Sequence, residues 1–322
     1  MQEKAIAYPV DSRLLEIARY KIVKAAKGCG IALRQTFAKE GKTLRRKAGG
    51  YAHARQPKRL ARALKRQRTI VGKLIREVRG KLSAGAIKAE PSAFSLSSLH
   101  TLLERAERIR TQQRHDKNKL YALHAPEVEC ISKGKARNRY EFGVKVSVAV
   151  THKQGLMIGA KRFVGNPYDG HTLAAQLTQT NALIVQSGKK VTQAYVDLGY
   201  RGVDADNPGV RVLHRGRIKS MSQIERKRLQ RRQAVEPAIG HLKHDSRMVR
   251  CYLKGSLGDA LHAISCAAGY NIRWLMRAML RLGLTGLFAL LNLLLWFALA
   301  LRCTPPSKHR HAFAAQGILV AI

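Results

Sequence analysis

Apolar residues recur at helical spacing in the first part of the chain. After Pro9 this spacing predicts a helix, with an apolar stripe of Leu14, Leu15, Ile17, Ala18, Ile22 and Val23. Gly41 and Gly49-Gly50 predict a loop. A second helix is expected over 56–79, with buried positions at Leu60, Leu64, Ile70, Val71, Leu74, Ile75 and Val78. A third is expected over 95–119, so residues 1–125 are interpreted as a helical region.

From residue 140 the apolar period becomes two. Residues 140–150 and 156–164 predict two strands joined as a hairpin. Asp169 is a plausible cap for a helix from Thr172 to about Gln186. A third strand is expected over 191–196, and we expect the three strands to form one sheet. This arrangement places an α/β core within residues 126–277.

Two apolar stretches follow this core. A helix is expected from Leu253 to Arg277, with one face formed by Leu257, Leu261, Ile264, Ala268 and Ile272. Residues 278–322 are expected to form an apolar C-terminal helix and tail. Within them, residues 282–301 carry no charge and are long enough to span a membrane. The alternative is a buried or oligomerising helix, which Asn292 and the basic body of the chain favour.

The net charge narrows the classes of partner. The 322 residues include 60 Lys and Arg against 20 Asp and Glu, a formal charge of +40. This excess is unlike an ordinary enzyme of small molecules and predicts a polyanion partner, most simply DNA, bound with strong salt dependence. The polar face of the helix over 56–79 is either solvated or contacts phosphates through Arg59, Arg62, Lys65, Arg66, Lys73 and Arg76.

Cysteine spacing and the N-terminal residues bear on the compartment. The five cysteines are irregularly spaced and show no zinc-binding pattern, so we expect neither a zinc site nor a disulfide framework. Residues 1–4 show no signal-peptide pattern. We therefore expect a cytoplasmic, nucleoid-associated protein.

Two acids stand out as candidates for metal-dependent chemistry. Asp197 follows a short apolar strand and precedes glycines, a position where α/β folds place functional residues, although a turn-initiating Asp is the alternative. Glu236 lies between Arg232 and Lys243, and on one continuous helix the three side chains would fall within about 40° of one another. Pro237 places Glu236 at a helix start or an irregular turn. These features predict an acidic metal site with a basic rim.

Several stretches, taken in order, resemble the DDE transposases of bacterial insertion sequences, most closely the group numbered five. They are Glu3–Asp11, Gly49–Gln56, Tyr140–Lys145, Asp169–Leu173, Asp197–Gly202 and Arg231–Lys243. The resemblance implies a ribonuclease H-like mixed sheet flanked by helices. It also implies Mg²⁺-dependent DNA cleavage and strand transfer, in which two aspartates and a glutamate hold two Mg²⁺ ions.

The resemblance also assigns roles to individual residues. Asp197 corresponds to the second acid and Glu236 to the third, both as catalytic residues and metal ligands. Arg232 and Lys243 are expected to contact DNA phosphates, as are Tyr200 and Arg201 beside Asp197. A homo-oligomer is expected. The family's tyrosine two turns before the glutamate falls on Leu229, where this chain departs from the pattern.

The first family aspartate lies just ahead of the stretch that resembles Glu3–Asp11. Because the chain begins at Met1, we expect an N-terminally truncated transposase, incomplete at the first strand, with residues 1–125 as a basic helical insertion. Asp11 is interpreted as a helix cap. With two of three acids, weak or no strand transfer is expected, and the alternative function is a non-catalytic basic nucleic-acid-binding protein.

Overall fold

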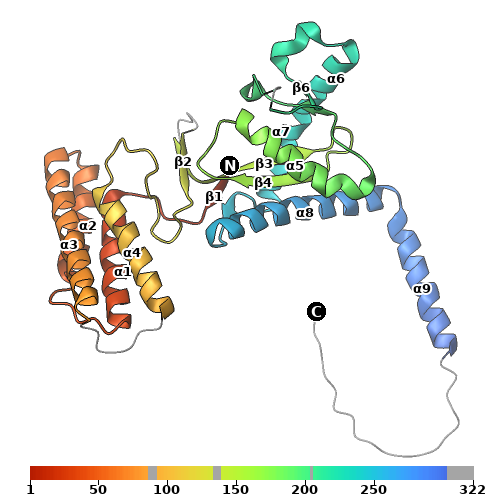
Figure 1. Cartoon of the computed structure of the whole chain (residues 1–322). Coiled ribbons are helices and arrows are strands. Elements are labelled where there is room, and N and C mark those ends of the chain that lie inside the picture. The colour runs from red at the N-terminus through yellow and green to blue at the C-terminus, as the bar shows by residue number, and fades with distance from the viewer. Residues whose placement is uncertain (86–92, 133–138, 204–205, 303–322) are drawn as a thin grey trace, which may run out of the picture. The chain divides into compact units, whose positions relative to one another are not determined.

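The computed structural model describes residues 1–85, 93–132, 139–203 and 206–302. Four helices form a bundle (Figure 1): α1 Asp11–Gly28, α2 Ala38–His53, α3 Pro57–Ser83 and α4 Ala93–Thr111. Its core is made of the predicted apolar stripes of α1 and α3 together with Leu99, Leu103, Ala106 and Ile109 of α4. The predicted helices at α1 and α3 are therefore confirmed.

Two details of the bundle differ from expectation. The predicted loop at Gly41 and Gly49-Gly50 is wrong, because all three glycines lie within α2. A Cβ on Gly41 would lie 2.6 Å from Nε of Arg19, so glycine allows α2 to approach α1 closely. The third helix is shorter than predicted because the Gln112 side chain hydrogen bonds to the backbone of Leu120 and closes a loop there.

The larger sheet has five strands in the order β2-β3-β1-β7, with β4 paired to β3. Their bounds are β1 Gln2–Lys4, β2 Glu129–Ser132, β3 Tyr140–Val150, β4 Met157–Phe163 and β7 Arg250–Cys251. The antiparallel β3–β4 hairpin confirms the prediction. The sheet is mixed, because β1 pairs antiparallel with β3 and parallel with β7. β1, β2 and β7 were missed because they are too short to show a period.

The third predicted strand does not join this sheet. β5 Gln193–Tyr195 pairs in parallel with β6 Arg211–Leu213 in a separate two-stranded sheet. The expectation of one sheet is wrong because α5 Leu173–Ile184 packs against both groups of strands. Gln179 of α5 donates to the Ala160 carbonyl of β4 at 3.0 Å, whereas Leu173 and Leu177 pack against Val212 of β6.

The remaining helices of the sheet region include η4 Arg215–Ser220, α6 Gln223–Arg231, η5 Arg232–Ala234, α7 Val235–His244 and α8 Gly255–Arg281, along with three further 3-10 helices, η1 Gly170–Thr172, η2 Val185–Ser187 and η3 Leu198–Tyr200. Ala238 and Leu242 of α7 share a core with β3, β4 and α8. The face that α8 buries is not the predicted apolar one. Leu257 is 70% exposed, whereas Ala263 on the opposite face is fully buried. Small residues on that face allow α8 to lie close to the sheet.

The chain divides into two compact units, Met1–Asn271 and Ile272–Ile322. In the second, Gly283 has φ 67°, which ends α8 before α9 Leu284–Arg302 begins. Among the residues that the structure describes, no helix combines the length and apolar character needed to cross a membrane. The end of the predicted C-terminal region, residues 303–322, lies outside the described residues.

Candidate functional site

Asp197 lies in the turn that follows β5, before the short helix η3 Leu198–Tyr200. One carboxylate oxygen accepts the Leu198 N–H at 2.9 Å. The other lies 3.4 Å from Nη2 of Arg232, and the Asp197 side chain is 64% exposed. The side chain therefore both starts the turn and pairs with a predicted DNA-binding cation.

Glu236 lies in the first turn of α7, as the position of Pro237 indicated. A single helix from Arg232 to Lys243 is not formed, because Arg232 belongs to η5. A proline ring clashes with the carbonyl four residues earlier, so α7 begins close to Pro237. Glu236 is exposed and Lys243 half-buried. Both point away from buried Ala238 and Leu242, since α-helical geometry separates the two pairs by about 100° or more.

The Arg232–Asp197 contact joins the turn after β5 to η5, which leads into α7. Arg232 lies four residues before Glu236, so the ion pair brings the turn after β5 against the segment that leads into α7. Two carboxylates and one guanidinium thus share one region of the molecule. Because Asp197 is mostly exposed, the ion pair is open to exchange with another anion, such as a phosphate.

Asp169 is a residue of this region that the sequence interpretation missed. Its predicted capping role is wrong: Thr172 is the N-cap residue of α5, and the Asp169 side chain makes no capping hydrogen bond. Instead, Asp169 Oδ1 lies 2.5 Å from Nζ of Lys145 on β3. A Cβ on Gly199 would lie 3.1 Å from Oδ2 of Asp169, so this carboxylate packs against the turn that carries Asp197.

Tyr200 and Arg201 lie at the end of the same turn. Burial raises the pKa of the Tyr200 phenol, and the nearby Asp169 carboxylate adds to this effect, although hydrogen bonds to Thr172 and Ser147 oppose it. The phenol is thus engaged with Thr172, the N-cap residue of α5, and with Ser147 of β3. The Arg201 side chain is exposed, and its guanidinium lies 3.0 Å from the Cβ position of Gly216. Of the two, Arg201 is the more accessible to a phosphate.

The fit of a metal ion can be tested on these side chains. Carboxylate oxygens are ligands that Mg²⁺ prefers. Within the described ranges, however, no group of three or more His, Cys, Asp or Glu side chains could hold a metal ion. In addition, Asp197 faces Arg232 and Asp169 faces Lys145. The described residues therefore do not fit a complete two-metal site.

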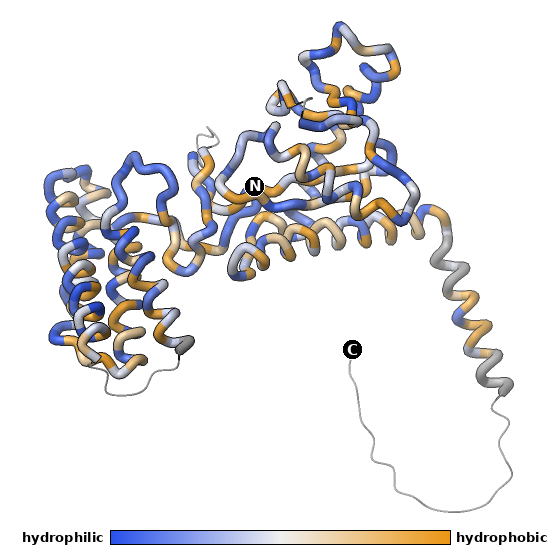
Figure 2. Tube along the Cα trace, in the orientation of Figure 1, coloured by the Kyte–Doolittle hydropathy of each residue, from blue (hydrophilic) through white to orange (hydrophobic). Residues whose placement is uncertain are grey.

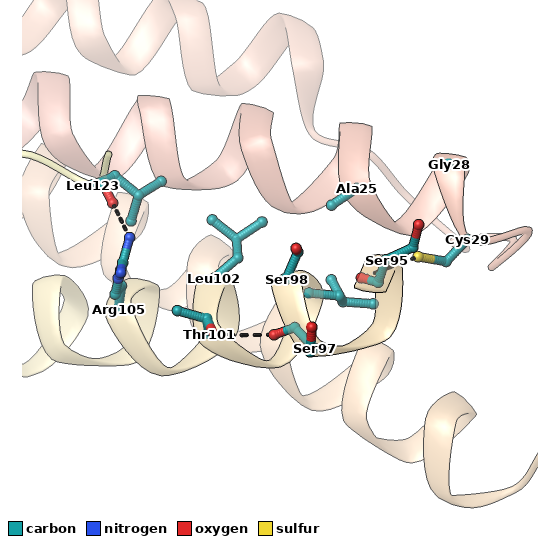
Figure 3. Close-up of a pocket in the computed structure, with 11 residues that line it drawn as sticks. Ala25, Gly28, Cys29, Ser95, Ser97, Ser98, Thr101, Leu102, Arg105 and Leu123 are labelled. Carbon is teal, nitrogen blue, oxygen red and sulfur yellow. Dashed lines mark hydrogen bonds between the residues drawn. The ribbon is translucent and has the colours of Figure 1, made fainter. Parts of the chain in front are cut away.

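A cavity of about 620 Å³ lies in the helical bundle, between α1 and α4 (Figure 3). Its lining includes Cys29, Ser98 and Arg105, and Arg105 donates to the Leu123 carbonyl at 3.2 Å. None of the predicted site residues lines this cavity. It therefore adds nothing to the chemistry around Asp197 and Glu236.

Comparison with known families identifies the sheet region. The sequence model of the transposase DDE domain matches residues 108–272, about half of the chain. The chain belongs to the family of transposase DDE domains. All of the predicted site residues lie inside the matched segment. The mixed sheet with its flanking helices is compatible with the ribonuclease H-like fold that the resemblance implied.

A second comparison found a relative of this chain in Rhizobium meliloti, described as uncharacterized protein ORF8 in the nfe locus. The two sequences are 48% identical over 56 residues, which cover 17% of this chain and 27% of that protein. The chain thus matches about a quarter of its relative's length. No solved structure matches the chain.

Proposed function

We propose that this chain is a transposase that acts on DNA, with metal-dependent cleavage and strand transfer at phosphodiesters weak or absent in the chain alone, because the described residues do not fit a complete two-metal site. Asp197 and Glu236 are the two acids to which we assign this activity. Arg201, Arg232 and Lys243 are assigned to the DNA backbone, and Tyr200 to the same contact region. The observation that carries the proposal is the Arg232–Asp197 ion pair within the segment that matches the transposase DDE domain.

The ion pair supports a definite role for Arg232. In the free protein its guanidinium is shared with the Asp197 carboxylate at 3.4 Å. A DNA phosphate offers the same guanidinium a bidentate partner, and arginine matches phosphate geometry closely. DNA binding would then release Asp197 from its cation. Arg232 would thereby couple DNA binding to the loss of the ion pair that holds the Asp197 carboxylate.

Cleavage and strand transfer of DNA bearing the element's ends test the proposal. The reactions contain Mg²⁺, Mn²⁺ or a chelator, and the substitutions are Asp197→Asn and Glu236→Gln. Glu104→Gln is the matched control, because Glu104 is an exposed helical glutamate outside the matched segment. Any metal-dependent products, which we expect to be weak, should disappear in both site variants and persist in the control. Activity that survives Glu236→Gln would make the site assignment wrong.

A second function, DNA binding without catalysis, is favoured by one specific observation. The described residues contain no group of three metal-ligating side chains, and Asp197 is paired with a cation instead. This function predicts salt-dependent DNA binding with no products under any metal condition. It also predicts that Glu236→Gln leaves binding unchanged.

A further inference from the structure

The outer face of α3 carries a row of cations that the site around Asp197 does not use. Lys58, Arg62, Lys65, Lys73 and Arg76 are all exposed, and we call them the α3 basic stripe. At about 100° per residue they fall within about 80° of one another on the helix. The apolar residues that α3 buries lie on the opposite side and include Val71, Leu74 and Val78.

This row is long and straight. From Lys58 to Arg76 the helix rises about 27 Å, at about 1.5 Å per residue. Duplex DNA carries about one negative charge per 1.7 Å of its axis, so a groove edge alongside the stripe presents several phosphates over that length. Figure 2 shows hydrophilic residues (blue) alternating with hydrophobic ones along the helices of the bundle.

Few acids neutralise these cations within the bundle. Glu40 pairs with Arg66 at 2.6 Å, and Glu77 pairs with Lys81 at 2.9 Å. Among the described residues, Lys58, Arg62 and Lys65 form no ion pair with a carboxylate. The stripe's cations without an ion pair, Lys58, Arg62 and Lys65, lie in the N-terminal half of α3, whereas Lys73 and Arg76 help to lower the pKa values of Glu40 and Glu107.

A purely solvated role accounts poorly for this arrangement. Lys58 and Arg62 are four residues apart, and Arg62 and Lys65 are three apart, so like charges face each other along the helix. Each such pair destabilises an isolated helix slightly. A polyanion laid along the row would remove this repulsion.

We propose that the α3 basic stripe binds the phosphate backbone of duplex DNA without reading its sequence. The surface is separate from the acids of the transposase DDE domain, and α3 lies outside the matched segment. A duplex is preferred to a single strand because the stripe carries no aromatic side chain on which bases could stack. The expected contribution is affinity and salt dependence, not cleavage.

The test measures binding of the full chain to a duplex of unrelated sequence, about 20 base pairs long, at several salt concentrations. The stripe variant combines Lys58→Gln, Arg62→Gln and Lys65→Gln, the three stripe cations without an ion pair among the described residues. We expect the slope of log affinity against log salt to shrink by two to three, at about 0.9 for each lost phosphate contact. Affinity at low salt should fall roughly tenfold or more.

The matched control is Lys21→Gln with Lys24→Gln and Lys27→Gln, three exposed cations of α1. It removes the same charge from another face of the bundle. An equal loss of slope in both triple variants would overturn the proposal, because binding would then follow net charge alone. Arg66→Gln should change the slope less than Arg62→Gln does, since Glu40 already neutralises Arg66.

Two further measurements separate this inference from the proposed function. Thermal unfolding of the stripe variant should occur at the wild-type temperature or slightly above it, because the three side chains are exposed and their mutual repulsion is removed. Glu236→Gln should retain the full salt slope even where cleavage is lost. If the stripe variant affects binding to single-stranded RNA but not to duplex DNA, the assignment to duplex DNA is wrong.

Discussion

Asp169 and Gly199 are in close contact: Oδ2 of the aspartate lies 3.1 Å from the position that a Cβ on the glycine would take. The other carboxylate oxygen of Asp169 is held by Lys145 at 2.5 Å. The Thr172 hydroxyl donates to the Asp169 backbone carbonyl at 2.6 Å, which fixes the backbone of the same residue just before α5. The turn that carries Asp197 therefore packs against a side chain that Lys145 of β3 holds in place.

Gly199→Ala should disturb this contact. The added methyl group lies closer to Asp169 than a normal packing contact, and Lys145 limits how far Asp169 can yield. We expect a loss of about 1–3 kcal/mol in the free energy of unfolding, as for other overpacked sites, measured by chemical denaturation. The control is Gly269→Ala in α8, where no atom lies within 4 Å of the Cβ position. It should gain about 0.5–1 kcal/mol. Equal free energies of unfolding for Gly199→Ala and the wild type would show that the Asp169 side chain can move away from the added methyl group at no cost.

The sequence predicted the helices and strands whose periodicity is long. α1, α3 and the β3–β4 hairpin follow from apolar spacing alone. Periodicity could not show which face of a helix is covered. On α8 the larger apolar residues, such as Leu257, are exposed, whereas Ala263 and Cys266 are buried. The close approach at Gly41 depends on Arg19 of another helix, so no local signal distinguished that glycine from a helix breaker.

The candidate site was predictable only in part, for a similar reason. Asp197 and Glu236 stand out because acids are scarce in so basic a chain, and Arg232 stands out because it lies one helical turn before Glu236. Asp169 was interpreted as a helix cap because it lies just before a helix. Its partner Lys145 is 24 residues away on β3, and only the folded sheet brings the two together. A polar residue that pairs across elements leaves no pattern in one sequence.

Asp197→Asn should strengthen DNA binding. The substitution removes the negative charge that lies 3.4 Å from the guanidinium of Arg232 and leaves that cation available to a phosphate. We expect the slope of log affinity against log salt concentration to grow by about 0.9, the value for one added phosphate contact. Arg232→Gln should not tighten binding. Asp197→Asn should not alter the free energy of unfolding by more than about 0.5 kcal/mol, because the Asp197 side chain is 64% exposed. Weaker binding by Asp197→Asn would contradict the proposed role of Arg232.

Asp259→Asn should destabilise the fold strongly. Asp259 is fully buried, and its Oδ1 lies 2.6 Å from Nζ of Lys4, which also lies 2.9 Å from Glu127. This network ties β1 to α8. Lys4 would keep Glu127 as its partner, so the expected loss is that of one buried hydrogen bond to a charged group, about 1.5–3 kcal/mol. Denaturation of Glu40→Gln provides the comparison, since its half-exposed pair with Arg66 should contribute no more than about 1 kcal/mol. Similar losses in the free energy of unfolding in the two variants would contradict the role of Asp259 as a buried partner of Lys4.

The same network should make stability depend on pH at both ends of the scale. Burial opposes the charge on Lys4, but hydrogen bonds to Asp259 and Glu127 outweigh it and raise the pKa of Lys4. Burial likewise opposes the charge on Glu127, and the hydrogen bond from Lys4 outweighs it and lowers the pKa of Glu127. The stabilisation from Glu127 is present above its unfolded pKa of about 4.3 and is lost as pH falls through the folded value. The stabilisation from Lys4 is present below about pH 10.4 and is lost as pH rises through its folded value.

The free energy of unfolding should therefore be highest between about pH 5 and pH 10 and decline on both sides. Glu127→Gln isolates one contribution, because it removes a titrating carboxyl and keeps its shape. We expect a shallower decline below about pH 5 in this variant, measured by denaturation at several pH values. Some decline should persist, because Glu40 and Glu107 also have lowered pKa values from their Arg66 and Arg110 hydrogen bonds. If the free energy of unfolding of the variant falls as steeply below about pH 5 as that of the wild type, the Glu127 carboxylate contributes nothing to stability through Lys4.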